Sequence, residues 1–101
     1  PLLLSIIATP VEHPKVPGWE QLAATAALVA TLELVLFDAG WTAIWRTGPG
    51  VGLPQVRQLL GVGDSEQLLG WLYIGGRTEA GPDSRPDPDV SGKISALPEP
   101  R

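Results

Sequence analysis

The chain has 101 residues, enough for one domain at the small end of the usual size range. It contains no cysteine and a single histidine, which excludes a disulfide framework, a thiolate metal site and a site built from several histidines. The net charge of −4 leaves no basic stripe for nucleic-acid phosphates, so we expect no nucleic-acid partner and, by default, a soluble cytoplasmic protein.

The chain begins with an apolar run, residues 1–8, that predicts a strand. Its continuous hydrophobicity is typical of a strand covered on both faces. The run has neither the positive region nor the cleavage site of a secretory signal. Because the sequence starts inside a core strand without a methionine, we expect it to be a fragment. Residues 9–18 hold three prolines and predict an extended connection, in which His13 is solvated or locally hydrogen-bonded.

A long helix is predicted over residues 19–38, which lack Gly and Pro and are rich in Ala and Leu. Apolar residues lie around the whole helix rather than on one stripe, so we expect it to be buried nearly all round. A core of about 75 residues is too small to cover it, and we expect a partner subunit or a missing half to cover one face. Thr25, Thr31 and Glu33 interrupt the apolar run, so no membrane span is expected.

A short strand is predicted directly after this helix. Gly40 is suited to the left-handed residue that commonly ends a helix. Residues 41–46 are aromatic and β-branched and predict a strand that ends in Arg46. The following loop, through Gly50, places a cation, a hydroxyl and flexible backbone at the carboxyl end of a strand, where open α/β sheets usually hold ligands.

The remaining elements complete a layered domain. A short helix with one apolar face is predicted over residues 53–61, and an apolar strand over residues 67–74, ended by two glycines. Alternating strands and helices over residues 1–76 predict a single α/β or α+β domain. Residues 77–101 hold five of the eleven prolines and few large apolar groups, and so predict an extended carboxyl-terminal arm without a core of its own.

Arg46 is the strongest candidate for binding. A guanidinium beside the Thr47 hydroxyl and a glycine-containing loop suits an oxyanion or a phosphate, although a surface arginine in a salt bridge is the alternative. Trp45 is open to two interpretations, packing in a core or interface, or flanking a flat heterocycle. Without a P-loop lysine, a dinucleotide-binding glycine motif or a plausible Ser-His-Asp triad, the sequence identifies no catalytic residue and no metal ligand.

Three motifs resemble the nitroreductase family in order and spacing. They are HPKVPGWEQ at residues 13–21, AIWRTG at residues 43–48 and LGWLYIG at residues 69–75. More narrowly, they are similar to the carboxyl half of the small single-domain NAD(P)H nitroreductases. The resemblance covers about residues 1–76 and Pro86-Asp87-Pro88 of the tail. These 101 residues hold no counterpart of the amino-terminal half, in which the family carries an Arg-Arg-Ser motif for the flavin.

The resemblance implies an α+β fold with a mixed sheet, a long central helix at residues 19–38 and a homodimer formed through that helix. It implies FMN at the dimer interface, contacted by Trp45, Arg46 and Thr47. It also implies hydride transfer from NAD(P)H through FMN to nitroaromatics, quinones or similar acceptors. Residues 77–101 would reach over the partner subunit.

Two other functions remain open at this point. The chain could be a catalytically inactive dimerisation or regulatory remnant that has lost the cofactor. It could also be a flavin-binding module without turnover. Bound flavin and NAD(P)H oxidation together distinguish these alternatives from the oxidoreductase.

Overall fold

The computed structural model of the chain describes residues 1–78 and 85–101. Both predicted helices and all three predicted strands of residues 1–76 are present. In chain order the elements are β1 (Leu2–Ala8), α1 (Gly18–Asp38), β2 (Trp41–Arg46), the 3-10 helix η1 (Pro49–Gly52), α2 (Pro54–Leu59), β3 (Gln67–Gly76) and the 3-10 turn η2 (Ser91–Lys93).

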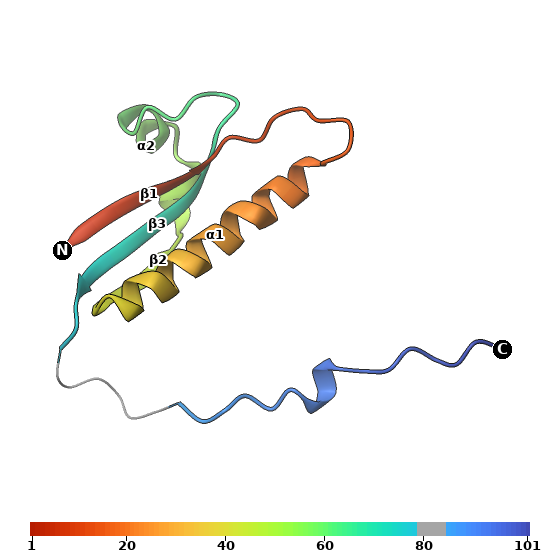
Figure 1. Cartoon of the computed structure of the whole chain (residues 1–101). Helices are drawn as coiled ribbons and strands as arrows, with labels where there is room; N and C mark the ends of the chain where they lie inside the picture. Colours follow the sequence, from red (N-terminus) through yellow and green to blue (C-terminus); the bar gives the residue numbers. More distant parts are fainter. Residues whose placement is uncertain (79–84) are drawn as a thin grey trace.

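The three strands form one sheet in the order β1-β3-β2 (Figure 1). The longest strand, β3, lies in the centre, and its alternate residues Gly70, Leu72 and Ile74 are buried, as expected for a strand with one face on a core. The α+β class is confirmed. Both pairings are antiparallel, so the mixed sheet that we expected is not present among the described strands.

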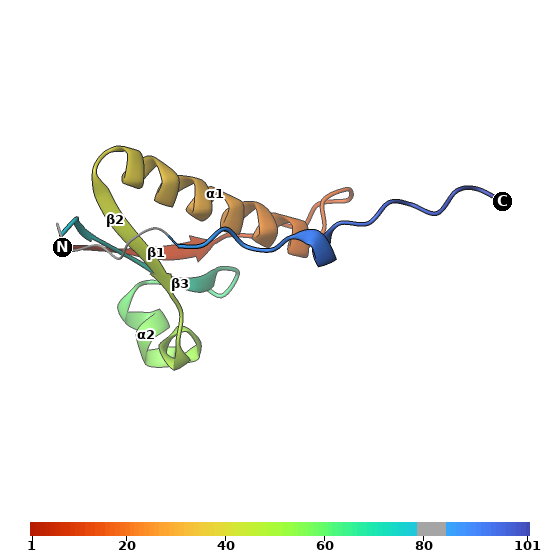
Figure 2. The same cartoon turned by 90° about the horizontal axis from the view of Figure 1, so that it is seen from below.

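The sheet lies between two helical layers of unequal size. Figure 2 shows α1 along one face, while α2 lies on the opposite side. The core lies between α1 and the sheet and is built from Ile6, Val29, Leu72 and Ile74, with Leu32, Leu36, Ala43, Trp45 and Leu69 packed against it. Leu72, at the centre of the sheet, has no exposed surface.

The boundaries of α1 agree with the prediction, and one side of the helix is uncovered within this chain. The helix is followed by Gly40, whose φ of 91° is the left-handed conformation expected there. Val29 is the one buried residue of α1, and Leu28 and Leu34 are 68% and 70% exposed. The small sheet covers only one side of α1, as expected for a helix that this chain cannot cover by itself. Burial of the other side by a partner subunit or a missing half stays a prediction.

By length and composition, α1 is also apolar enough to cross a membrane. Its most apolar 18-residue window has a mean hydropathy of 1.5, and 6% of that window is buried. The polar interruptions therefore do not exclude a span, and that part of the sequence argument was wrong. The Thr25 and Thr31 hydroxyls donate to the carbonyls of Gln21 and Ala27, which satisfies them within the helix. The inner face of α1 packs on the sheet through Val29, Leu32 and Leu36, as in a core helix.

The first strand lies at an edge of the sheet, and it is only partly buried. Ile6 and Ala8 belong to the buried residues, whereas Leu2 and Leu3 are 54% and 51% exposed. The expectation of a strand covered on both faces is wrong within this chain, because α1 diverges from the beginning of β1 and α2 does not reach it (Figure 2). The start of β1 consequently presents an uncovered apolar surface.

The connection between β1 and α1 is held by side chains within it. The Nδ1 atom of His13 accepts hydrogen bonds from the amides of Lys15 and Val16, at 3.2 and 3.1 Å, which confirms the expected local role of this histidine. The Gln21 side chain binds both backbone groups of Val11 and the carbonyl oxygen of Val16, over 2.8 to 3.0 Å. These bonds fix how the chain enters α1.

The described residues of the carboxyl-terminal arm, 77–78 and 85–101, are exposed, and residues 85–101 are extended apart from η2. Val90, Ile94 and Leu97 are 51%, 75% and 93% exposed, so the arm lies on no core within this chain. The Ser91 amide donates to the Asp89 carboxylate at 3.0 Å, and this bond lowers the pKa of that carboxyl from its ordinary value. Residues 79–84 of the expected arm lie outside the described residues.

Candidate functional site

The candidate site lies at the carboxyl end of β2. There Trp45 pairs with Leu72 and Arg46 pairs with Trp71, which is the last pair between β2 and β3. Directly paired residues share a face of the sheet and successive residues alternate. Trp45 therefore lies on the α1 face with Leu72, and Arg46 lies on the opposite face with Trp71.

Trp45 belongs to the core and also makes a polar contact. Its ring is half-buried and packs against the cluster around Leu72. The indole Nε1 donates a hydrogen bond of 3.0 Å to the carbonyl oxygen of Leu69. Of the two interpretations left open by the sequence, the structure shows packing in the core. A role for Trp45 against a flat ligand remains a prediction.

Gly70 lies beneath this tryptophan and was not identified from the sequence. Its φ of 122° is a conformation that residues with side chains rarely adopt. A Cβ at this position would overlap the carbonyl oxygen of Arg46, and it would lie 2.9 Å from Trp45 Nε1 and 3.1 Å from Thr47 Cγ2. An isolated glycine inside a predicted strand is the signal that could have revealed this close approach.

A β-bulge on the other side of β3 accounts for the unusual backbone here. Ile6 of β1 pairs with Gly70 and Ile7 pairs with Leu68, so Leu69 is an extra residue opposite β1. Such a bulge bends the strand and increases its twist. The bend lies next to the last pair of β2 and β3, at the residues that the sequence identified as binding candidates.

Arg46 and Thr47 are both exposed at the end of β2. The next residue, Gly48, has a φ of 133°, and the chain then turns into η1. Two other arginines in the described ranges donate to backbone carbonyls, Arg57 to Gly63 and Glu66 and Arg77 to Phe37. The Arg46 guanidinium makes no such bond within residues 1–78 and 85–101, so its donors are available to an anion.

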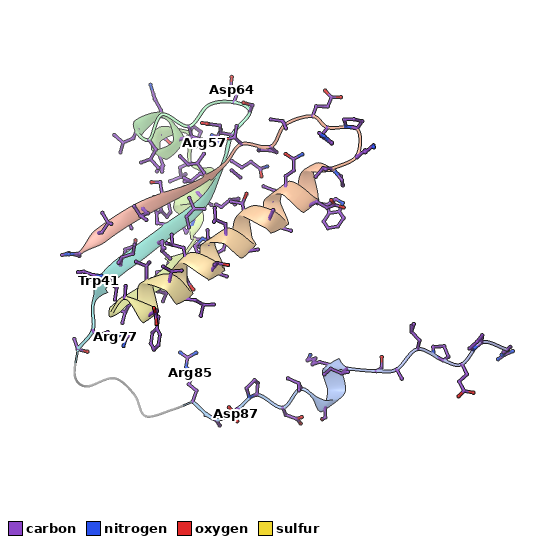
Figure 3. All side chains as sticks on the ribbon, in the orientation of Figure 1. Trp41, Arg57, Asp64, Arg77, Arg85 and Asp87 are labelled. Atoms are coloured by element: carbon purple, nitrogen blue, oxygen red, sulfur yellow. The ribbon has the colours of Figure 1, made fainter. Side chains whose placement is uncertain are left out.

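Arg57 illustrates the contrasting, structural use of a guanidinium. It donates from α2 to the carbonyl oxygens of Gly63 and Glu66, at 2.9 and 3.2 Å. The Glu66 carboxylate in turn accepts from the Gly63 amide at 2.7 Å. This network holds the loop between α2 and β3, at the end of the sheet where Figure 3 shows Arg57. Arg57 is therefore not a candidate for ligand binding.

A hollow of about 620 Å³ lies on the sheet beside the candidate site. Its lining residues come from all three strands: Pro1, Leu2, Leu3, Thr42, Ala43, Ile44, Tyr73, Ile74 and Gly75. Ile44 and Arg46 are two residues apart in β2, so they share the face opposite α1. Arg46 does not line the hollow, but it lies on the same face, further along the strand.

Arg46 and Thr47 are suited to bind the phosphate group of a cofactor. Arg46 offers a planar fork of donors and Thr47 a hydroxyl, both exposed, and such groups recognise phosphate oxygens. The described residues contain no group of three or more His, Asp or Glu side chains that could hold a metal ion. The chain thus offers one wall of an anion site and no described metal centre.

The sequence was compared with family models and with known proteins. No protein-family model matches the sequence. The chain is 32% identical over 75 residues to the putative NAD(P)H nitroreductase YdjA of Escherichia coli strain K12, and equally to the protein of the same name in strain O157:H7. The aligned region is 74% of this chain and 41% of those proteins, so the chain spans less than half of their length.

Among solved structures, the chain resembles that of a nitroreductase-like family protein from Bacillus cereus. The TM-score is 0.77 at 21% sequence identity, and the match covers 94% of this chain and 50% of the other. At this identity the likeness establishes the fold. Because nearly the whole chain is matched, α1 and the sheet together belong to that fold.

Proposed function

The chain is homologous to the nitroreductase family, and from this premise we propose that it acts as part of an FMN-dependent NAD(P)H oxidoreductase of the cytoplasm. The observation that carries the proposal is the exposed Arg46–Thr47 step at the end of β2. It combines a guanidinium without a backbone partner among the described residues with a hydroxyl, on a backbone that passes close to Gly70. The motif AIWRTG, through which the sequence resembles the family, includes both residues.

In this proposal the chain binds and orients the cofactor. Arg46 and Thr47 hold the phosphate end of FMN through charge-assisted and hydroxyl hydrogen bonds, and Trp45 packs beside them. When bound, FMN would supply the redox chemistry, which is hydride transfer between NAD(P)H and a nitroaromatic, a quinone or a similar acceptor. No proton-transferring residue is assigned to the chain.

The proposal includes a homodimer formed through α1. The outward side of the helix carries small and apolar residues at helical spacing: Ala27, Leu28, Thr31, Leu34 and Val35. Leu34 is 70% exposed, and a contiguous apolar surface of this kind marks an interaction site. A second copy would bury this surface, and the arm at residues 85–101 could then lie on the partner subunit.

Two measurements on purified protein test the function. We expect FMN to bind, as followed by quenching of flavin fluorescence. We also expect the FMN-loaded protein to oxidise NAD(P)H in the presence of a nitroaromatic or a quinone. Bound FMN without any NAD(P)H oxidation would contradict the oxidoreductase and indicate a flavin-binding module. Failure to bind FMN would leave neither function.

A catalytically inactive dimerisation or flavin-binding remnant is the second candidate. It is favoured by the open position of Arg46, which is exposed and whose guanidinium makes no hydrogen bond to the residues that the structure describes. A dimer that forms without flavin and lacks turnover would support this candidate over the first.

A further inference from the structure

We infer that Trp45 and Gly70 are positioning residues that fix the Arg46–Thr47 step, and that Trp45 does not contact the ligand itself. The inference rests on the proposed function only in taking FMN as the ligand of Arg46. Its structural basis is the set of contacts around the last pair of β2 and β3. It assigns to Trp45 a role different from the one that the family resemblance implies.

The alternation of side chains separates Trp45 from Arg46. Trp45 shares the α1 face with Leu72, and Arg46 shares the opposite face with Trp71. The Trp45 ring packs against the hydrophobic core between the sheet and α1. A flat ligand held by the Arg46 guanidinium on one face of the sheet would not meet an indole packed on the other.

The polar atom of Trp45 is already used within the chain. An indole has one donor and no acceptor, and here the donor binds the Leu69 carbonyl at 3.0 Å. Backbone pairing between β2 and β3 ends at Arg46 and Trp71, two residues from Leu69 along β3. The hydrogen bond from the Trp45 side chain therefore joins β2 to β3 beyond the last backbone pair, next to Arg46 and Thr47.

Gly70 completes this arrangement from the other strand. Without a side chain, it allows the Arg46 carbonyl, the Trp45 indole and the Thr47 methyl to approach its Cα. The carbonyl contact determines where the peptide between Arg46 and Thr47 lies. Because the guanidinium and the hydroxyl extend from the two ends of this peptide, moving it displaces both groups at once.

Two substitutions test the inference, each with a matched control. Trp45→Phe keeps an aromatic ring in the core and removes the donor to Leu69, and Trp41→Phe makes the same change at a half-exposed position of β2. Gly70→Ala adds a Cβ that overlaps the Arg46 carbonyl, and Gly75→Ala adds one in the same strand with nothing within 4 Å. If Gly70→Ala does not fold, the Trp45→Phe variant alone tests the inference.

The readouts are the backbone amide NMR shifts of Arg46 and Thr47 without ligand, and the dissociation constant of FMN. We expect the amide chemical shifts of Arg46 and Thr47 to change in Trp45→Phe and Gly70→Ala and to be unchanged in the two controls. We expect FMN to bind more weakly in Trp45→Phe than in Trp41→Phe, because Arg46 and Thr47 are no longer held in place by the bond to Leu69. The absorption band of bound FMN should keep its position, because the indole does not contact the flavin.

Three results distinguish failure of the inference from failure of the proposed function. Unmoved Arg46 and Thr47 amides in Trp45→Phe overturn the inference, whatever the affinity for FMN. A displaced flavin absorption band with unmoved amides also overturns it, since that indicates direct contact. A wild-type protein that binds no FMN overturns the proposed function, while the amide shifts still decide whether Trp45 and Gly70 position the step.

Discussion

The guanidinium of Arg77 lies 3.8 Å from the centre of the Phe37 ring and donates a hydrogen bond to the Phe37 carbonyl oxygen. Phe37 belongs to the last turn of α1, which contains no basic residue of its own. A cation at the carboxyl end of a helix is favourable because the last carbonyls carry a partial negative charge. Arg77 thus joins the residue after β3 to the end of α1, where Figure 3 shows it.

Replacing Arg77 by Gln should lower the free energy of unfolding by about 1 kcal/mol, from the loss of an exposed cation–π contact and of a charge at the helix end. Arg85→Gln removes the same charge from the extended arm and should leave stability unchanged. Urea unfolding at low and high salt measures both variants. Equal stability of the two variants at low salt would contradict this role of Arg77.

Gln21→Glu should destabilise the connection between β1 and α1. A carboxylate keeps the size of the side chain but cannot donate to the Val11 and Val16 carbonyls. Losing these two bonds should cost about 1 to 3 kcal/mol at neutral pH. Gln55→Glu, at an exposed position of α2, serves as the control and should change stability by no more than about 0.5 kcal/mol. Thermal unfolding of both variants measures the loss of stability, which we expect to be larger in Gln21→Glu than in Gln55→Glu.

Arg46→Ala should weaken FMN binding by about 1.5 to 3 kcal/mol, as expected for hydrogen bonds made by a charged group. Arg85→Ala removes an equal charge from a site remote from β2 and should have little effect. Arg46→Lys should retain part of the affinity, because a lysine keeps the charge but not the planar fork of donors. Flavin fluorescence titration gives the three dissociation constants. If Arg46→Ala bound FMN as tightly as the wild type, Arg46 would not belong to the site.

Leu34→Lys should dissociate the proposed dimer, since it places a charge in the middle of the exposed apolar side of α1. Leu59 is 85% exposed on α2, and Leu59→Lys makes the same change outside the proposed interface. Sedimentation velocity over a range of concentrations compares the variants. A dimer that survives Leu34→Lys, or a wild-type protein that is monomeric throughout, would exclude α1 as the interface.

The order of the elements could be predicted because each is specified locally. The absence of Gly and Pro over residues 19–38 determines the length of α1, and Gly40 marks its end. The aromatic and β-branched run after it predicts β2 up to Arg46. These signals depend on neighbouring residues in the sequence, so they did not require knowledge of the tertiary contacts.

The burial and the detailed contacts could not be predicted in the same way. Continuous hydrophobicity in α1 and β1 indicates surfaces that need covering, but it does not say whether the covering atoms belong to the same chain. The bond from Trp45 to Leu69 and the approach of Arg46 to Gly70 join residues 24 apart in sequence, and their geometry arises only when β2 pairs with β3. Gln21 likewise gains its role from the return of a loop ten residues earlier.

The visible absorption spectrum of the purified, desalted protein, with its mass confirmed, tests the central claim most directly. We expect a flavin spectrum, either retained through purification or restored when FMN is added, and lost in Arg46→Ala. A protein that remains without a flavin spectrum after FMN is added and unbound FMN is removed would contradict this, and would show that the chain does not hold the cofactor.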